Sequence, residues 1–229
     1  MEALRAVWCC CRRMHEKGVW QMNKKRAIVG VLAGTLALVL ASGVAWAATV
    51  QCQENAPGDP VQVCLGTTGA DTITGTSGVD WIRALRGNDL AKGMGGQDLV
   101  QGGKGKDTVD GGGGADPFIF GGESGPQFEG GPYTDASDDY AYGGSGGDGI
   151  IGGYAQGGVD HVFGEDGDDY IQTYQRGIAK NFGVVVTKEV IKCGAGYDTV
   201  IFDKDKDVVA ENCEKLYPVL PGGEGAPPL

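Results

Sequence analysis

The sequence predicts an all-β protein, a solenoid in which tight turns and short parallel strands alternate. A nine-residue unit, Gly-Gly-x-Gly-x-Asp-x-apolar-x, recurs along the chain, as in GMGGQDLVQ at 93–101 and GGKGKDTVD at 102–110. Its glycine-rich first half permits sharp turns. Its last three residues alternate polar, apolar and polar, as a short strand with one buried face does. Self-similarity at a fixed period is typical of repeat architectures.

The chain begins with the features of an export signal. The basic triplet KKR at 24–26 precedes an apolar run, and AWA at 45–47 places small residues at both positions that signal peptidase reads. We therefore expect residues 1–47 to be an N-terminal extension plus signal peptide, with Met22 as an alternative start, and the mature protein to be secreted. An uncleaved signal anchor, which would keep the protein at the cell surface, is the alternative, because the uncharged stretch 27–51 is long enough to span a bilayer.

Four cysteines follow the expected cleavage site, and an even number in an exported chain indicates disulfides. Cys52 and Cys64 precede the repeats, whereas Cys193 and Cys213 follow most of them, so a coil between the pairs would separate them. We therefore expect local pairing, the first pair within an N-terminal cap at 48–65. Each bond closes a short loop worth roughly 3 kcal/mol on the chain-entropy model. Metal ligation is the alternative, but no C-x-x-C spacing favours it.

The repeats form two arrays and one isolated unit. Six consecutive nonapeptides fill 66–119, three more lie within 143–172, and a last one stands at 193–201. Two units complete one turn of a flattened coil, so that residue i lies over residue i+18. The apolar residues of the strands then point inward and stack into a thin core, which in the first array comprises Ile73, Ile82, Val100, Val109 and Phe118.

The aspartates of the repeats form a candidate metal site. A stack this narrow buries little apolar area, and its glycines lose much conformational entropy on folding. The aspartates alternate between two ladders, one on each side of the coil, with backbone carbonyls nearby. Carboxylates and carbonyls are the oxygen ligands of Ca²⁺, and a divalent ion between successive turns would cancel the repulsion within a ladder. The predicted ligands are Asp71, Asp80, Asp89, Asp98, Asp107, Asp116, Asp148, Asp160, Asp169 and Asp198.

At these residues the chain resembles the hemolysin-type calcium-binding repeats, also called RTX repeats. The resemblance implies a right-handed parallel β-roll, a kind of β-solenoid, which holds several Ca²⁺ ions through Asp carboxylates and backbone carbonyls of neighbouring repeats. The first array departs from the pattern in two places. Ala84 and Leu85 stand where the Asp89 turn should have glycines, and Pro117 stands where the strand after Asp116 should begin.

Two segments interrupt the repeats. The first, 120–142, is rich in glycine, proline and aromatic residues and carries Asp135, Asp138 and Asp139. We expect it to be an insertion loop at the surface, and it is the best candidate for a partner-binding surface. The second, 173–192, combines basic residues with a β-rich GVVV, and we expect a hairpin or a longer turn.

The last repeat and a C-terminal cap occupy 193–217. Within them, DKDKDVVAENCE at 203–214 has the acidic spacing of an EF-hand loop, but Val208 stands where that loop requires glycine. We therefore expect a structural cap held by Cys213, with a calcium site as the alternative. The tail, 218–229, is rich in proline and glycine and is expected to be disordered.

Charge argues against several classes of partner. The chain has 19 basic and 30 acidic residues, and removal of residues 1–47, which hold seven and two of them, leaves a net charge of about −16. Such a surface does not attract nucleic acid or an anionic membrane once the leader is removed.

No motif in the sequence points to catalysis. The expected mature chain has one histidine, His161, at a repeat position that tolerates any residue, and it has no HExxH or P-loop motif. We therefore expect a non-enzymatic, secreted calcium-binding module, structural or interacting, whose folding depends on extracellular calcium. A cell-surface or extracellular polymer or protein would be its partner. The alternative is an extracellular hydrolase-type enzyme or accessory domain with an unrecognised carboxylate site.

Overall fold

The structure, a computed structural model, describes residues 47–52, 61–123, 135–152, 158–173, 175 and 186–220. These residues all belong to one compact unit, Gly43–Leu229, and the chain's other unit, Met1–Ser42, lies outside the described residues. The predicted leader, except for Ala47, and the tail from residue 221 onward also lie outside them. In the described part of the chain, no helix reaches the length and hydropathy that crossing a membrane requires.

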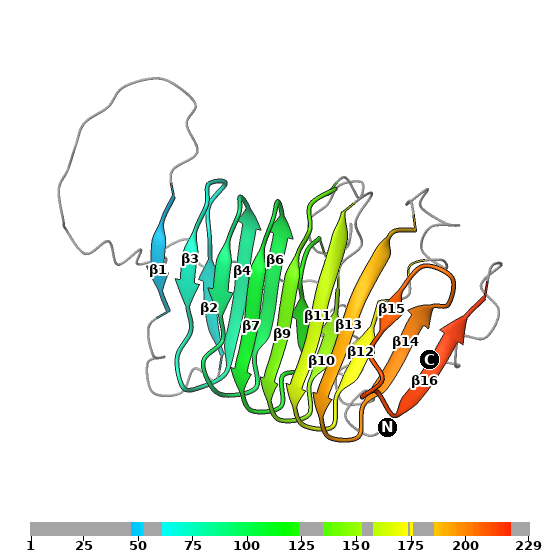
Figure 1. Cartoon of the computed structure of the whole chain (residues 1–229). Coiled ribbons are helices and arrows are strands. Elements are labelled where there is room, and N and C mark those ends of the chain that lie inside the picture. Colours follow the sequence, from blue (N-terminus) through cyan, green and yellow to red (C-terminus); the bar gives the residue numbers. More distant parts are fainter. Residues whose placement is uncertain are drawn as a thin grey trace, which may run out of the picture. The chain divides into compact units, whose positions relative to one another are not determined.

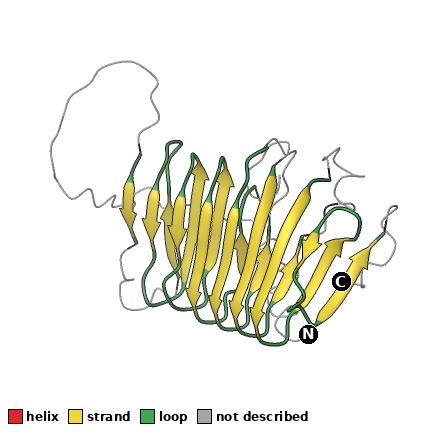
Figure 2. Cartoon of the chain, in the orientation of Figure 1, coloured by secondary structure: helices red, strands yellow, loops and turns green. Residues whose placement is uncertain are grey.

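The described residues form two parallel β-sheets of eight strands each, and Figure 2 shows strands and loops but no helix among them. The chain enters the two sheets alternately, so strand order in space follows strand order in sequence (Figure 1). This arrangement confirms the predicted all-β roll of parallel strands. Sheet A contains β1 (Thr49–Gln51), β3 (Thr72–Thr74), β5 (Leu90–Lys92), β7 (Thr108–Gly113), β9 (Tyr140–Ser145), β11 (Val159–Asp166), β13 (Lys188–Ala195) and β15 (Val208–Val209). Sheet B contains β2 (Gln62–Leu65), β4 (Asp80–Arg86), β6 (Leu99–Lys104), β8 (Phe118–Phe120), β10 (Gly149–Ile151), β12 (Tyr170–Gln172), β14 (Thr199–Asp203) and β16 (Lys215–Val219).

The core between the sheets is narrow because each short strand turns mainly one side chain inward. In sheet A, Ile73 pairs with Ala91 and Ala91 pairs with Val109, at the predicted spacing of 18 residues. These three side chains are fully buried. The residues on either side of them in each strand are more exposed, as the period of two requires.

One core position differs from the prediction. The sequence predicts Phe118 as the inward residue of its strand, but Ile119 is the fully buried one and Phe118 is only half-buried. In the first array, the residue after a repeat's Asp donates its N–H to the Asp carbonyl one turn earlier, as Thr108 does to Asp89 (2.8 Å). Pro117 occupies this position and has no N–H, so strand pairing starts one residue later.

The segments between the repeats leave the stack and return to it in register. Strand β7 pairs directly with β9, although 32 residues separate the partners Thr108 and Tyr140. The end of segment 120–142 therefore belongs to sheet A. Strand β13 begins at Lys188 and pairs in parallel with β11, so the end of segment 173–192 is a strand of the stack.

A disulfide lies at each end of the stack. Cys52, directly after β1, is bonded to Cys64 in β2, and Cys193 in β13 is bonded to Cys213 shortly before β16. These are the two local pairs that the sequence predicts. The first bond joins the first strands of the two sheets, where each strand has a neighbour on one side only.

Candidate metal centre

Two columns of buried carboxylates run along the stack, each residue standing at the start of a strand. The first column serves the strands of sheet A and the second column those of sheet B, and every member is at most 3% exposed. All ten predicted ligands lie in these columns, together with two residues that the sequence did not single out as ligands. The first column consists of Asp71, Asp89, Asp107, Asp139, Asp160 and Glu189, and the second of Asp80, Asp98, Asp116, Asp148, Asp169 and Asp198.

Hydrogen bonds from turn to turn hold the columns in line. The N–H of Asp80 donates to Oδ1 of Asp98 (2.8 Å), and the N–H of Asp98 donates to Oδ1 of Asp116 (2.7 Å). Nine such bonds, between 2.7 and 3.0 Å, link neighbouring members of the two columns. One oxygen of each accepting carboxylate is therefore used to orient the side chain.

The second oxygen of most column residues is buried without a hydrogen-bond partner in the described part of the chain. A buried carboxylate oxygen without a partner is costly, and native proteins rarely leave one. Such oxygens recur along both columns, so they form a pattern. They belong to Asp89, Asp98, Asp116, Asp139, Asp148, Asp160, Asp169, Glu189 and Asp198.

In the second column, the oxygens of Asp98, Asp116, Asp148 and Asp169 point to a space that the first glycine of the repeat keeps open. A Cβ on Gly143 would lie 2.8 Å from Oδ2 of Asp148 and closer still to the carbonyl oxygen of Gly164, one turn later. The same pair of neighbours, a carboxylate and the carbonyl of the next turn, surrounds Gly93 and Gly111. A carboxylate and a carbonyl that converge on one space suit a hard cation such as Ca²⁺, so the residues present fit the predicted metal.

Burial and mutual repulsion oppose negative charge in the columns. Burial, and then the neighbouring column carboxylates, raise the pKa of Asp98 to about 7, although the N–H of Asp80 acts in the opposite direction. Burial, followed by the charge of Asp160, raises the pKa of both Asp139 and Glu189 to about 10. The columns therefore require neutralisation by protons or by a cation.

The first two turns differ from the rest because threonines donate hydrogen bonds to their aspartates, although Oδ1 of Asp80 is buried without a hydrogen-bond partner in the described residues. The N–H and the hydroxyl of Thr76 donate to Oδ2 of Asp80 (2.6 and 3.0 Å). In the preceding turn, Thr67 donates its N–H to Oδ2 and its hydroxyl to Oδ1 of Asp71. The oxygen that faces the glycine space elsewhere therefore has its own donors in these two turns.

The second position of several turns has a left-handed backbone, although Thr67 and Thr76 at this position do not. Gly103 and Gly112 have φ values of +110° and +99°, and Leu85 and Met94 adopt +83° and +80° at the same position. Leu85 in the Asp89 turn therefore keeps the backbone conformation that glycine has in other turns. The column bond to Asp89 Oδ1 is retained at 2.7 Å.

Sequence reasoning missed Asp139 and Glu189 as column members. Ser137 and Thr187 stand two residues before them, where the repeat has glycine, and Glu189 has the longer acid. Both keep a buried apolar residue two positions later, and this signal could have found them.

Two further acids close the columns at their C-terminal ends. Oδ1 of Asp207 accepts from the N–H of Glu189 (3.0 Å), and Oε2 of Glu214 accepts from the N–H of Asp198 (2.9 Å). The acids that would share one EF-hand loop thus end different columns.

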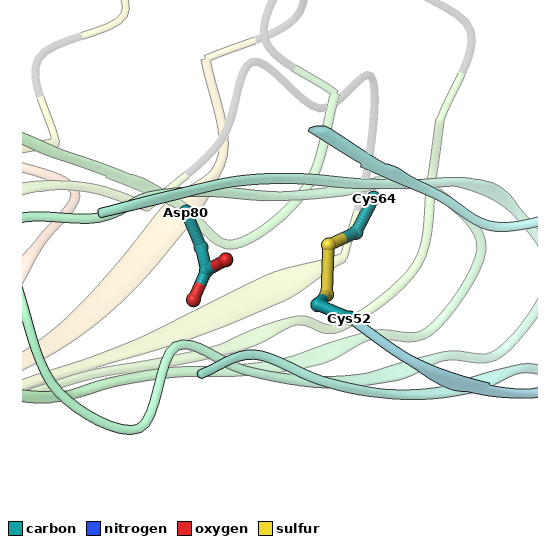
Figure 3. A group of neighbouring side chains, drawn as sticks. All are labelled: Cys52, Cys64 and Asp80. Atoms are coloured by element: carbon teal, nitrogen blue, oxygen red, sulfur yellow. A yellow bond between two sulfur atoms is a disulfide. The ribbon is translucent and has the colours of Figure 1, made fainter. Parts of the chain in front are cut away.

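Figure 3 shows a third group of potential ligands, Cys52, Cys64 and Asp80, whose ligand atoms lie within 4.8 Å of one another. The two sulfurs are bonded to each other. Because only a thiolate binds a metal well, this group is a disulfide beside a column residue and not a second metal centre.

Comparison with known proteins agrees with this geometry. A family model for the RTX calcium-binding nonapeptide repeat matches the chain in 4 copies, at residues 65–98, 84–116 and 154–174. No significant match was found among curated proteins or among solved structures. Four column residues lie outside the matched ranges: Asp139, Asp148, Glu189 and Asp198.

Proposed function

We propose, since the chain carries RTX calcium-binding nonapeptide repeats, that it is a calcium-binding β-roll module whose folding depends on the ions held by its two columns. One observation carries the proposal. Along the second column, at Gly93, Gly111, Gly143 and Gly164, a buried carboxylate oxygen without a hydrogen-bond partner among the described residues meets a backbone carbonyl of the next turn. Backbone donors and the apolar core leave this oxygen unsatisfied.

The turn at Asp98 illustrates what each group does. The N–H of Asp80 holds Oδ1 and so fixes the side chain. Oδ2 and the carbonyl of Gly111 face the space at Gly93, which any larger residue would fill. Bound Ca²⁺ would supply the positive charge that cancels the repulsion between column carboxylates and would tie one turn to the next. Without it the carboxylates repel, and the glycine-rich turns have little else to order them.

We place the module outside the cell. The leader expected at 1–47 would direct export, and the bonds Cys52–Cys64 and Cys193–Cys213 form and persist in oxidising compartments. Extracellular calcium modules bind at roughly 10⁻⁴ to 10⁻³ M. On this proposal the chain stays loose while calcium is scarce and folds after export. N-terminal sequencing of protein from the medium should begin at Ala48, and a chain retained in the membrane would contradict this step.

The role that we propose is structural or one of interaction, and we assign no reaction to the protein. The buried carboxylates are used in the columns, so their abundance gives no reason to infer acid–base chemistry. A cell-surface or extracellular polymer or protein is the class of partner that suits an exported scaffold of this kind.

The experiment that tests the function is a calcium titration of the purified protein. In EDTA we expect far-ultraviolet circular dichroism to show little β-structure, and addition of CaCl₂ to produce the full β spectrum. MgCl₂ is the control, because Mg²⁺ demands a strict octahedral geometry and is expected to act weakly. A full β spectrum in EDTA that calcium leaves unchanged would refute the proposal.

A further inference from the structure

Three buried carboxylates gather where the chain leaves β8 and later enters β9. Glu123, Asp135 and Asp139 are 1%, 5% and 1% exposed. Glu123 and Asp135 belong to no repeat, and the ranges matched by the family model include none of the three. An acidic group of this kind, withdrawn from water, requires a source of positive charge.

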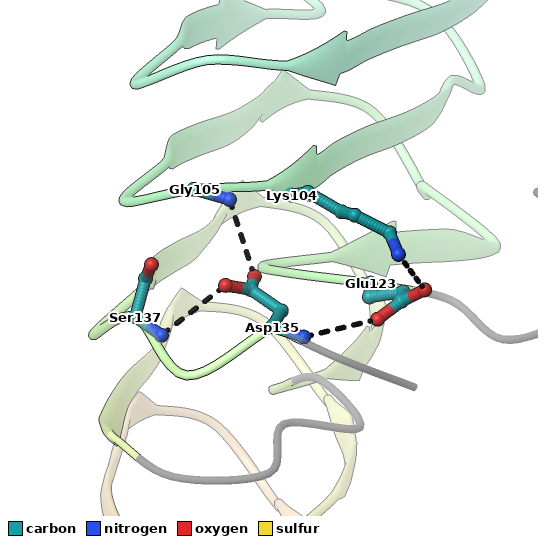
Figure 4. Close-up of polar contacts among 5 residues, drawn as sticks. All are labelled: Lys104, Gly105, Glu123, Asp135 and Ser137. Atoms are coloured by element: carbon teal, nitrogen blue, oxygen red, sulfur yellow. Dashed lines mark hydrogen bonds and ion pairs between the residues drawn. The ribbon is translucent and has the colours of Figure 1, made fainter. Parts of the chain in front are cut away.

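Glu123 is fixed from two sides (Figure 4). Its Oε1 lies 3.1 Å from Nζ of Lys104, and its Oε2 accepts from the N–H of Asp135 (3.3 Å). Asp135 in turn accepts from the N–H of Ser137 at Oδ1 (3.2 Å) and from the N–H of Gly105 at Oδ2 (3.4 Å). Glu123 therefore orients the backbone of Asp135, and two further amides set the direction of its carboxylate.

Asp139 faces the same space from the first column. Its Oδ1 accepts from the N–H of Asp107 (2.8 Å), whereas its Oδ2 is buried without a hydrogen-bond partner in the described ranges. A Cβ on Gly122 would overlap Oδ2 of Asp139 and would lie 3.5 Å from Oδ2 of Asp135. Two carboxylates, rather than a carboxylate and a carbonyl, thus converge on a space that glycine leaves open.

Among the described residues, the charges of this group do not balance. Lys104 brings one positive charge to three carboxylates and makes its ion pair with Glu123. This leaves Asp135 and Asp139, two carboxylates that face one space and carry two negative charges when both are ionised. A divalent cation would neutralise them in a single step.

We propose that Asp135 and Asp139 bind a divalent cation, Ca²⁺ by its preference for flexible oxygen coordination, at a site outside the nonapeptide pattern. Glu123 and Lys104 are positioning residues for this site. The inference rests on the proposed function in that both use the same ion and share Asp139. It adds a ligand from the inserted segment, so this turn would hold its ion with two carboxylates.

Anomalous diffraction from crystals of the unaltered protein grown with CaCl₂ tests the site directly. We expect a calcium peak between Asp135 and Asp139 as well as peaks along the columns. Peaks along the columns with none at this position would overturn this inference and leave the proposed function standing. If no peak appears anywhere, both are contradicted.

A matched pair of variants tests the same point in solution. Isothermal calorimetry with CaCl₂ should show one ion fewer for Asp135→Asn than for the unaltered protein. Asp138→Asn is the control, because Asp138 is more exposed and its Oδ1 accepts from the N–H of Val159 (2.7 Å). It should keep the full number of ions. An unchanged number in Asp135→Asn would overturn the proposal.

A second pair leaves both carboxylates in place. Gly122→Ala fills the space between them and should also lose one ion. Gly113→Ala is its control, because a Cβ there would meet only ordinary contacts, the nearest to the hydroxyl of Ser145 at 3.4 Å. If neither Asp135→Asn nor Gly122→Ala reaches the normal β spectrum in calcium, the diffraction result on the unaltered protein decides.

Discussion

The second residue of each turn shows how closely single positions are constrained. Four repeats have glycine there, at Gly103, Gly112, Gly144 and Gly194, and Met94 adopts the same left-handed conformation with φ +80°. For a residue with a Cβ this conformation costs about 1–2 kcal/mol. The Met94 side chain is 54% exposed, so its packing offsets little of that cost.

Met94→Gly should therefore stabilise the protein. We expect the free energy of unfolding in saturating calcium to rise by about 1 kcal/mol, the relief of strain less the added entropy of glycine. Met94→Ala is the control, because it removes the long side chain but keeps the Cβ and the strain. Urea unfolding compares the two. An equal gain in both variants would show that the side chain, and not the backbone, is responsible.

Two aspartates of one column should differ in their importance for calcium. Asp98 turns an unpartnered oxygen to the glycine space, whereas Thr76 already donates to the equivalent oxygen of Asp80. We expect Asp98→Asn to raise the calcium concentration at the folding midpoint about tenfold, equivalent to about 1.4 kcal/mol, and Asp80→Asn to raise it less. Circular dichroism during calcium titration measures both. Equal shifts would contradict the distinction.

Most column residues could be predicted from the sequence because the repeat fixes their spacing. Asp139 and Glu189 could not, because Ser137 and Thr187 replace the glycine that marks the pattern. The difference between Asp80 and Asp98 was also hidden. It depends on donors from a threonine whose direction only the folded turn determines.

At the scale of strands and turns, the alternation of polar and apolar residues predicted the strands, but the backbone N–H groups determined the residue at which strand pairing begins. Pro117 moves the inward residue from Phe118 to Ile119 because pairing in β8 cannot begin at a residue without an N–H. The sequence also did not reveal where the two inserted segments resume pairing with the stack, in β9 and β13. Their length says nothing about where pairing resumes.

The C-terminal disulfide is an element whose contribution can be measured. The bond Cys193–Cys213 closes a loop with a sequence separation of 20. The double change Cys193→Ser with Cys213→Ser should lower the free energy of unfolding by about 3 kcal/mol on the chain-entropy model. Hydrogen exchange should then be fastest in β14 and β16, next to the lost link.

The double change Cys52→Ser with Cys64→Ser is the matched control for this element. Its hydrogen exchange should quicken in β1 and β2 instead. Uniform loss of protection along the whole stack in either variant would contradict a local role of the bond in its cap.

At the scale of the whole molecule, the charge of the columns makes folding depend on pH. Burial, the largest cause, raises the pKa of Asp98 and Asp169 to about 7 and that of Asp89 and Asp148 to about 6, from 3.8. Without metal, the folded form thus binds protons more tightly than the unfolded chain. Its stability is greatest near and below pH 4 and is lost as the pH rises through about 6 to 7.

We therefore expect opposite effects of pH with and without calcium. In EDTA, a change from about pH 8 to about pH 5 should increase the β signal in circular dichroism, because protons neutralise the columns. In limiting calcium the same change should raise the calcium concentration at the midpoint, because protons compete for the ligands. A β signal in EDTA that does not depend on pH would show that column charge does not oppose folding.

The architecture as a whole was predictable because one period specifies turns, strands and columns together. The C-terminal end of the coil was less predictable. Asp207 and Glu214 close different columns, a division that appears only when the coil brings each beneath its own strand edge.

The column bonds all point in one direction, since an earlier turn always offers the amide and a later turn the carboxylate. A chain that arrives with its N-terminus first therefore has an open amide at its advancing edge until the next turn docks. At the N-terminal end, Thr67 and Thr76 donate to the first aspartates of the two columns. At the C-terminal end, Asp207 and Glu214 accept from the last amides of the columns. A chain truncated before Asp207 and Glu214 would lack the acceptors for the last amide of each column, whatever the number of its turns.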